Sequence, residues 1–181
     1  MKHSKEELIT TLFHNTHARD YKIFVEQLQY LEPQIELVAP PHWRGENDYE
    51  SNHNGTHPTW SCCFDYVLIK HLGTERKFKT VQEIQMQLEK TTEQTEDSLE
   101  TSQEGDVIIY TNPAWLTFGF TGDNFQYAYM KSGLHHWGII RKDKSLRVES
   151  KWGYKGPALL HPPNCLPLFW QGDITIRRIK P

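Results

Sequence analysis

The feature that most constrains the fold of this 181-residue chain is the order of its hydrophobic patterns. Helical spacing dominates the first half, in the segments Lys5–His14, Tyr21–Leu31 and Val81–Lys90. Short apolar runs typical of strands dominate the second half, as in Asp106–Tyr110 and His136–Arg141. Helices followed by strands favour an α+β fold with an antiparallel sheet.

Cap and turn residues give the expected bounds of the helices. Ser4 and Glu7 form a capping-box pattern before the first helix, and Thr80 and Glu83 repeat it later. The second helix is expected to bury one apolar face and to end at Pro33. That face consists of Ile23, Phe24, Leu28 and Leu31.

Three further segments complete the expected secondary structure. A β-hairpin is predicted where Lys142-Asp143-Lys144 joins the strand His136–Arg141 to Ser145–Ser150, and Ile174–Ile179 is expected to be a closing strand. The polar and acidic stretch Thr91–Glu104 is interpreted as a mobile surface loop or a solvated helix extension.

Composition excludes several classes of protein. The chain is 37% hydrophobic and 12% aromatic, which is enough for a packed core. The net charge is −3 and no basic stripe is present, so nucleic acid is a poor partner. No apolar run approaches a membrane span and no signal-peptide core appears, so the default location is cytoplasmic; leaderless secretion would leave no mark.

Cysteine usage indicates a reactive thiol rather than a disulfide framework. The chain has three cysteines, Cys62, Cys63 and Cys165, an odd and small number. Cys63 opens an apolar helix-like segment that is expected to end at Gly73. A helix N-terminus stabilises a thiolate, so Cys63 is a candidate nucleophile. The alternatives are a core position for Cys63 and the same role for Cys62.

A histidine at the head of a strand supplies the candidate base. His135 and His136 are adjacent, so strand alternation points them to opposite faces, and only one can face the cysteine helix. A base needs a partner on its other ring nitrogen. Ser150 and His161 are the favoured partners, and Glu149 is the third candidate. Each also has a simpler role: Ser150 as a strand-end hydroxyl, His161 as the cap of a turn and Glu149 as a solvated charge.

Metal binding is a weaker interpretation of the same residues. His161 and Cys165 have a ligand-like spacing, but the adjacent pair Cys62-Cys63 fits zinc sites poorly. A second group, His42, His53 and His57, lies in a loop-like stretch and is expected to be solvated. We therefore predict no metal and no cofactor.

Taken together, these motifs resemble the NlpC-type branch of the papain-fold cysteine hydrolases. Cys62-Cys63-Phe64-Asp65 stands at the nucleophile motif, and Gly105-Asp106-Val107-Ile108 matches the Gly-Asp-Val-Val strand of the family. His136-Trp137-Gly138-Ile139 matches its His-Val-Gly-Ile strand and selects His136 over His135. Ser150-Lys151-Trp152-Gly153 with the later His161 resembles bacterial relatives of that fold. The resemblance covers roughly residues 59–167, and Phe64-Asp65 departs from the usual Ser-Gly.

The resemblance implies an architecture and a reaction. A nucleophile helix would pack on a small antiparallel sheet in residues 46–181, with a helical extension over 1–45 and a polar insertion at about 91–104. Cys63 would attack a peptide or other amide, His136 would act as base and acid, and Ser150 or His161 would orient His136. The backbone N–H of Cys63 would contribute to an oxyanion hole.

Two other functions remain open. Cys63-Phe64-Asp65-Tyr66 also resembles the Cys-x-Asp-Tyr opening of transglutaminase-like proteins. In those proteins an Asp on the next strand is the partner of the base, and the only Asp near that position here is Asp143, in the predicted turn. A binding module that has lost catalysis would use the aromatic residues Trp137, Trp152, Tyr154 and Trp170 for recognition, although core packing is their simpler role.

Overall fold

The computed structural model describes the chain except residues 1–2, 16–19, 41–62, 75–80, 113–133 and 154–155. Within the described parts, seven strands form one sheet in the order β1-β6-β5-β4-β3-β7-β2, and all neighbouring strands are antiparallel. The strands are β1 Glu36–Ala39, β2 Thr92–Gln94, β3 Val107–Thr111, β4 Leu134–Arg141, β5 Arg147–Lys151, β6 Ala158–His161 and β7 Asp173–Ile179.

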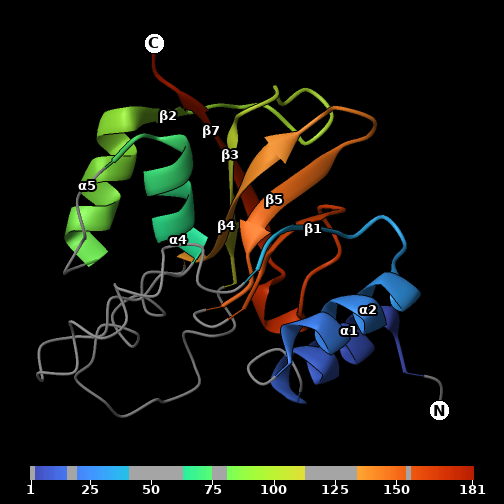
Figure 1. Ribbon diagram of the computed structural model, residues 1–181. Coiled ribbons are helices and arrows are strands. Elements are labelled where there is room, and N and C mark those ends of the chain that lie inside the picture. The colour runs from blue at the N-terminus through green and yellow to red at the C-terminus, as the bar shows by residue number, and fades with distance from the viewer. Residues whose placement is uncertain (1–2, 16–19, 41–62, 75–80, 113–133, 154–155) are drawn as a thin grey trace, which may run out of the picture.

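Helices cover both faces of this sheet (Figure 1). On one face lie α1 (Lys5–Asn15) and α2 (Tyr21–Leu31). On the other lie α5 (Val81–Thr91) and α4 (Cys63–Asp65), which continues as a π-helix over Tyr66–His71. A 3-10 helix, η3, spans Leu168–Trp170. The mixed α+β class and the antiparallel sheet predicted from the sequence are confirmed.

Alternation along the strands divides the core into two clusters. On the α1–α2 face, the helices pack against strand residues such as Ile108, Ile140 and Val148. On the α4–α5 face, the helices pack against Ile109, Trp137 and Ile139. Neighbouring residues of one strand therefore belong to different clusters, which decides where each candidate site residue points.

The predicted helix boundaries agree closely with the structure. The capping box is formed, since Ser4 N–H donates to Glu7 Oε2 at 2.9 Å and Glu7 N–H to Ser4 Oγ at 3.2 Å. The second helix ends before Pro33, but its predicted apolar face is partly wrong. Ile23 is 45% exposed, and Val25 takes the buried place beside Phe24 and Leu28.

The helix that carries Cys63 ends where the sequence predicted. Its last turns are wider than α-helical, because Leu72 N–H bonds to the carbonyl of Val67, five residues earlier. Gly73 then adopts a φ of 64°, a left-handed conformation that suits glycine and stops the helix. Thr80, the predicted cap of α5, lies outside the described residues.

Three strands, β1, β2 and β6, were not predicted. The polar stretch Thr91–Glu104 contains strand β2, so its interpretation as a loop or helix extension is wrong for residues 92–94. Thr92 is buried there and accepts a hydrogen bond from Arg177 Nε at 2.8 Å. His161 does not cap a turn, because it ends strand β6 between β5 and β1.

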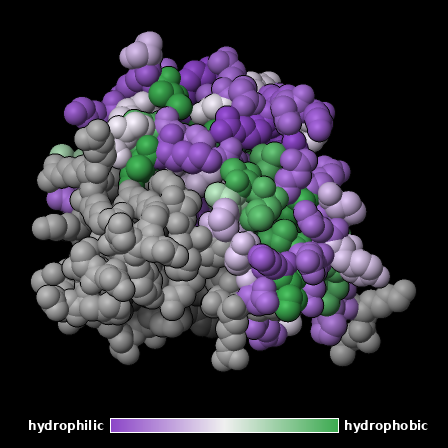
Figure 2. All heavy atoms as spheres, viewed as in Figure 1, coloured by the Kyte–Doolittle hydropathy of each residue, from purple (hydrophilic) through white to green (hydrophobic). Residues whose placement is uncertain are grey.

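Polar residues cover most of the described surface in the view of Figure 2. Hydrophobic side chains reach the surface mainly over β1 and around α1 and α2, where Leu8, Ile23, Leu37 and Val38 are exposed. No helix among the described residues is long and apolar enough to cross a membrane.

Candidate active site

His136 lies near the start of β4 and is completely buried. Its ring stacks on the indole of Trp170, with centroids 4.2 Å apart and planes 16° from parallel. Trp170 belongs to η3, which packs on the α1–α2 face of the sheet. The ring is therefore held in one orientation by an aromatic neighbour that the sequence offered only as core or recognition surface.

Two neighbouring strands complete a chain of hydrogen bonds from His136. Its Nε2 lies 2.9 Å from Ser150 Oγ on β5. The same hydroxyl lies 2.9 Å from His161 Nε2 on β6, and His161 Nδ1 lies 2.8 Å from the carbonyl oxygen of Pro162. The structure thus brings together three of the four predicted site residues, and we call them the His–Ser–His chain.

The hydrogen-bonding groups fix the proton positions in this chain. A carbonyl oxygen only accepts, so His161 Nδ1 must carry a proton for Pro162. Burial lowers the pKa of His161 to about 3, so this ring is neutral near pH 7 and its Nε2 accepts. The single proton of Ser150 is then donated to His161, and Ser150 Oγ accepts from His136 Nε2–H.

The remaining nitrogen of His136, Nδ1, carries a lone pair whenever the ring is neutral. In the neutral ring with a proton on Nε2, Nδ1 is unprotonated. Nδ1 is buried and makes no hydrogen bond to any described residue. An oriented imidazole with one nitrogen held and the other open is the arrangement required of a general base.

Gly138 makes room for the chain. A Cβ at this position would lie 2.3 Å from Val148 Cγ1 and 3.2 Å from Ser150 Cβ. The glycine two residues after His136 thus lets Ser150 approach the ring across the strand pair. This gives a physical reason for the His-Trp-Gly pattern that the sequence presented only as a motif.

Cys63 begins α4 beside the start of β4 (Figure 1) and is 5% exposed. It packs in the α4–α5 cluster with Trp137 and Ile139, and Phe64 meets Trp137 edge to face at 6.2 Å. His136 belongs to the opposite face of the same strand. The structure therefore places Cys63 next to the strand that carries His136, but without a hydrogen bond to Nδ1.

Glu149, the third candidate partner of the base, points away from His136. It is buried rather than solvated and accepts hydrogen bonds from Tyr66 at 2.6 Å and Lys70 at 2.8 Å. His71 Nε2 lies 3.1 Å from it, and Arg141 donates from two nitrogens at 2.9 and 2.8 Å. Glu149 thus ties the helix that carries Cys63 to the sheet.

Asp143 is also separate from the base. Both its carboxylate oxygens accept hydrogen bonds from Arg147 Nη2, at 2.9 and 2.8 Å. It therefore does not serve His136 as a transglutaminase-like partner.

The other candidates contribute little to a site. Cys165 is buried, and burial raises the pKa of its thiol to about 12. Among the described residues, no cluster of three or more His, Cys, Asp or Glu side chains could hold a metal ion. Cys62, His42, His53, His57 and Tyr154 lie outside the described residues, as does the side chain of His135.

Comparison with known proteins adds no assignment, since no protein-family model, curated protein or solved structure matches this chain.

Proposed function

We propose that this protein is a papain-like cysteine hydrolase that cleaves an amide bond through an acyl-enzyme. The observation that carries the proposal is the buried His136 ring, which the His–Ser–His chain orients and Trp170 stacks on, with no hydrogen bond from its Nδ1 to a described residue. The start of α4 beside β4 supplies the candidate nucleophile, Cys63.

The chemistry follows from these positions. His136 Nδ1 takes the thiol proton of Cys63, and the thiolate attacks the amide carbonyl carbon. When the tetrahedral intermediate collapses, the C–N bond breaks and His136 returns the proton to the leaving amine. The base then deprotonates a water molecule that releases the acid from the thioester. Throughout, Ser150 keeps accepting from Nε2–H and stabilises the imidazolium.

One movement is required, because the Cys63 side chain and the His136 ring start from opposite faces of β4. They can meet only around the start of the strand, where α4 also begins. A protein in which this approach never occurs would be a binding module on the same fold, and the packing of Cys63 in the α4–α5 cluster, on the other face from His136, favours that alternative.

Thiol alkylation tests the proposal without knowledge of the substrate. At neutral pH, iodoacetamide should modify Cys63 at least about tenfold faster than Cys165, because the helix N-terminus and a nearby base favour the thiolate of Cys63 while burial raises the pKa of Cys165. His136→Asn should slow the modification of Cys63 toward the rate of Cys165. Peptide mass spectrometry over time gives the rate at each cysteine.

His135→Asn is the matched control, since it makes the same change one residue earlier in the strand. It should leave the alkylation rate of Cys63 unchanged. Equal rates at Cys63 and Cys165 would favour the binding module. Faster reaction at Cys62 would reassign the nucleophile, and an effect of His135→Asn in place of His136→Asn would reassign the base.

A further inference from the structure

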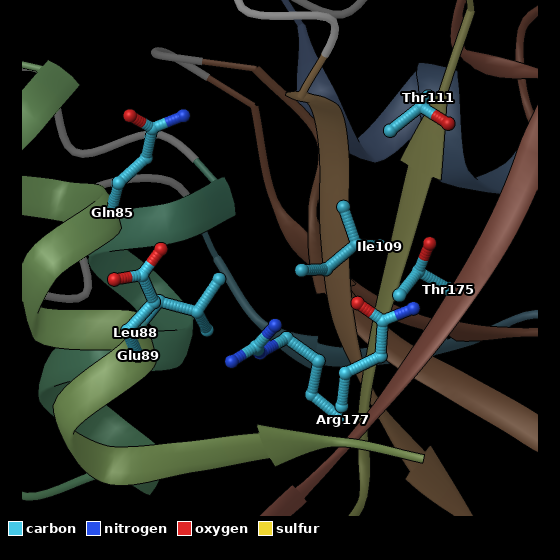
Figure 3. A pocket seen from close by; sticks show the side chains of 8 residues that line it. Gln85, Leu88, Glu89, Ile109, Thr111, Thr175 and Arg177 are labelled. Carbon is cyan, nitrogen blue, oxygen red and sulfur yellow. The ribbon is translucent and has the colours of Figure 1, made fainter. Parts of the chain in front are cut away.

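A cavity of about 180 Å³ lies between α5 and the sheet, on the α4–α5 face (Figure 3). Helix α5 and the strands β2, β3 and β7 contribute its walls. Its floor is apolar, formed by the buried side chains of Leu88 and Ile109. Hydroxyl groups of Thr111 and Thr175 line it as well. No step of the proposed hydrolysis uses this space.

Arg177 enters the cavity from β7, and its guanidinium points toward α5 (Figure 3). Its Nε and Nη2 donate to Thr92, to Oγ1 at 2.8 Å and to the carbonyl oxygen at 3.3 Å. Among the described residues, Arg177 forms no ion pair, and its Nη1 donates no hydrogen bond. Partial burial lowers the pKa of Arg177, and the charge of Glu89 opposes this effect.

Glu89 supplies a negative charge on the facing wall, from α5 (Figure 3). Its carboxylate makes no ion pair with Arg177 or with another cation of the described chain. Arg141, Arg147 and Arg178, by contrast, all pair with carboxylates. Two opposite charges, the exposed Glu89 and the partly buried Arg177, thus line one cavity without a direct ion pair, so a ligand with both charges would contact both.

We propose that this cavity binds the head group of an α-amino acid, with the carboxylate at Arg177 and the ammonium at Glu89. The planar guanidinium matches a carboxylate through parallel hydrogen bonds, for which Nη1 and the second N–H of Nη2 are available. A volume of about 180 Å³ equals that of roughly six liquid waters, which suits a small head group with a short side chain. The apolar floor would face the carbon atoms. The inference goes beyond hydrolysis and does not depend on Cys63.

Ligand titration followed by ¹H–¹⁵N NMR tests this site directly. The probes are L-alanine, acetate, methylammonium and inorganic phosphate, observed at the Arg177 Nε–H and at backbone amides of α5 and β7. Alanine should shift these signals saturably, and acetate and methylammonium should bind at least about tenfold more weakly, since each lacks one charge. Arg177→Gln and Glu89→Gln should each weaken alanine binding by about tenfold or more.

Lys144→Gln is the control for net charge, because Lys144 is exposed in the β4–β5 turn. It should bind alanine as the wild type does. Arg177 also donates to Thr92, so Arg177→Gln could affect folding as well as binding. Arg177→Lys keeps the positive charge but loses the planar guanidinium, and it should fold yet bind alanine more weakly. The proposal is overturned if alanine causes no shift at about 50 mM. It is equally overturned if acetate or phosphate binds as tightly as alanine, or if folded Arg177→Lys and Glu89→Gln bind alanine normally.

Discussion

At the scale of single residues, Ser150 sets the proton positions of the candidate base. Its hydroxyl has one proton, which His161 accepts, so it can only accept from His136. A serine between two histidines resembles a serine nucleophile, but the proton of Ser150 is directed to the buried, neutral His161 and not to His136. Ser150 therefore acts as a positioning residue, and its substitution should change the tautomer of His136.

Ser150→Ala should release His136 Nε2 and allow the tautomer with a proton on Nδ1, which cannot act as the base. We expect the alkylation rate of Cys63 at pH 7 to fall by at least about tenfold, within the range of general-base effects. The ¹⁵N chemical shifts of the His136 ring report the tautomer independently. Ser150→Thr retains the hydroxyl and should keep both the tautomer and the rate. An unchanged ¹⁵N pattern in Ser150→Ala would contradict the assigned role.

The sequence reduced the candidates for the base to His135 and His136 but left the hydrogen-bond partner of the base open. Alternation placed His135 and His136 on opposite faces of the sheet, with one of them expected to face the cysteine helix. His136, the chosen base, lies instead on the α1–α2 face, because helices cover both faces and their packing decides what each face contains. The sequence also left Ser150 and His161 as alternatives, whereas the structure uses both. Ser150 and His161 are adjacent because β6 pairs with β5. Strand β6 is short and flanked by Pro157 and Pro162, and it is held in the sheet by pairing with β1 and β5, which the sequence does not reveal.

At the scale of elements, Glu149 anchors the helix that begins at Cys63. Burial alone would raise the pKa of Glu149, but hydrogen bonds from His71, Lys70, Tyr66 and Arg141 outweigh it and hold the pKa well below the usual range. Tyr66, Lys70 and His71 lie in the π-helix, and Arg141 lies on β4. The carboxylate therefore fixes the distance between the nucleophile helix and the strand of the base.

Glu149→Gln should destabilise the protein by about 3–5 kcal/mol, because Lys70 and Arg141 would keep their charges without a buried anion. Urea denaturation measures the loss, and hydrogen exchange of the amides in Tyr66–His71 should rise above that of the sheet. Glu104→Gln is the matched control, since Glu104 pairs with the same Arg141 but is about half exposed. It should cost less than about 1 kcal/mol. Equal costs for the two variants would rule out Glu149 as the anchor.

Element predictions succeeded where local signals sufficed. Caps and apolar spacing defined α1 and α2, and continuous apolar runs defined β3 and β4. Strand β2 has no apolar pattern, and it exists because β7 offers its edge and Arg177 binds Thr92. The π-helical turns likewise have no sequence signal, since the wider helix accompanies the contacts of Tyr66 and Lys70 with Glu149.

At the scale of the whole molecule, the core on the α1–α2 face of the sheet buries two groups that respond oppositely to pH. His161 has an ordinary pKa of 6.5, lowered by burial to about 3, so the unfolded chain binds its proton more readily. The stability that neutral His161 contributes is complete above pH 6.5 and is lost as the pH falls toward 3. Cys165 has an ordinary pKa of 9.0, raised by burial to about 12, so its contribution is complete below pH 9.0 and is lost toward 12.

The free energy of unfolding should therefore be highest between about pH 6.5 and 9.0 and fall on both sides. Urea denaturation at closely spaced pH values measures the curve. Between pH 6.5 and 4.5, above the range of ordinary carboxylates, His161 should contribute a slope of up to ~1.4 kcal/mol per pH unit. His161→Gln should lower the plateau but flatten this slope, whereas His3→Gln, at an exposed position, should leave it unchanged.

The alkaline limb has its own variant. Cys165→Ala removes the thiol, so the fall in stability should begin only above pH 10. Tyrosines ionise there in the unfolded chain, whereas the raised pKa values of Tyr66 and Tyr110 keep these phenols protonated in the folded protein. Wild type should begin to lose stability about one pH unit earlier. If His161→Gln retains the acid slope, His161 takes up its proton in the folded protein at the same pH as in the unfolded chain. Ser150 would then be unable to donate to it below about pH 6.5, and the proton assignment that leaves Nδ1 of His136 open would fail in that range.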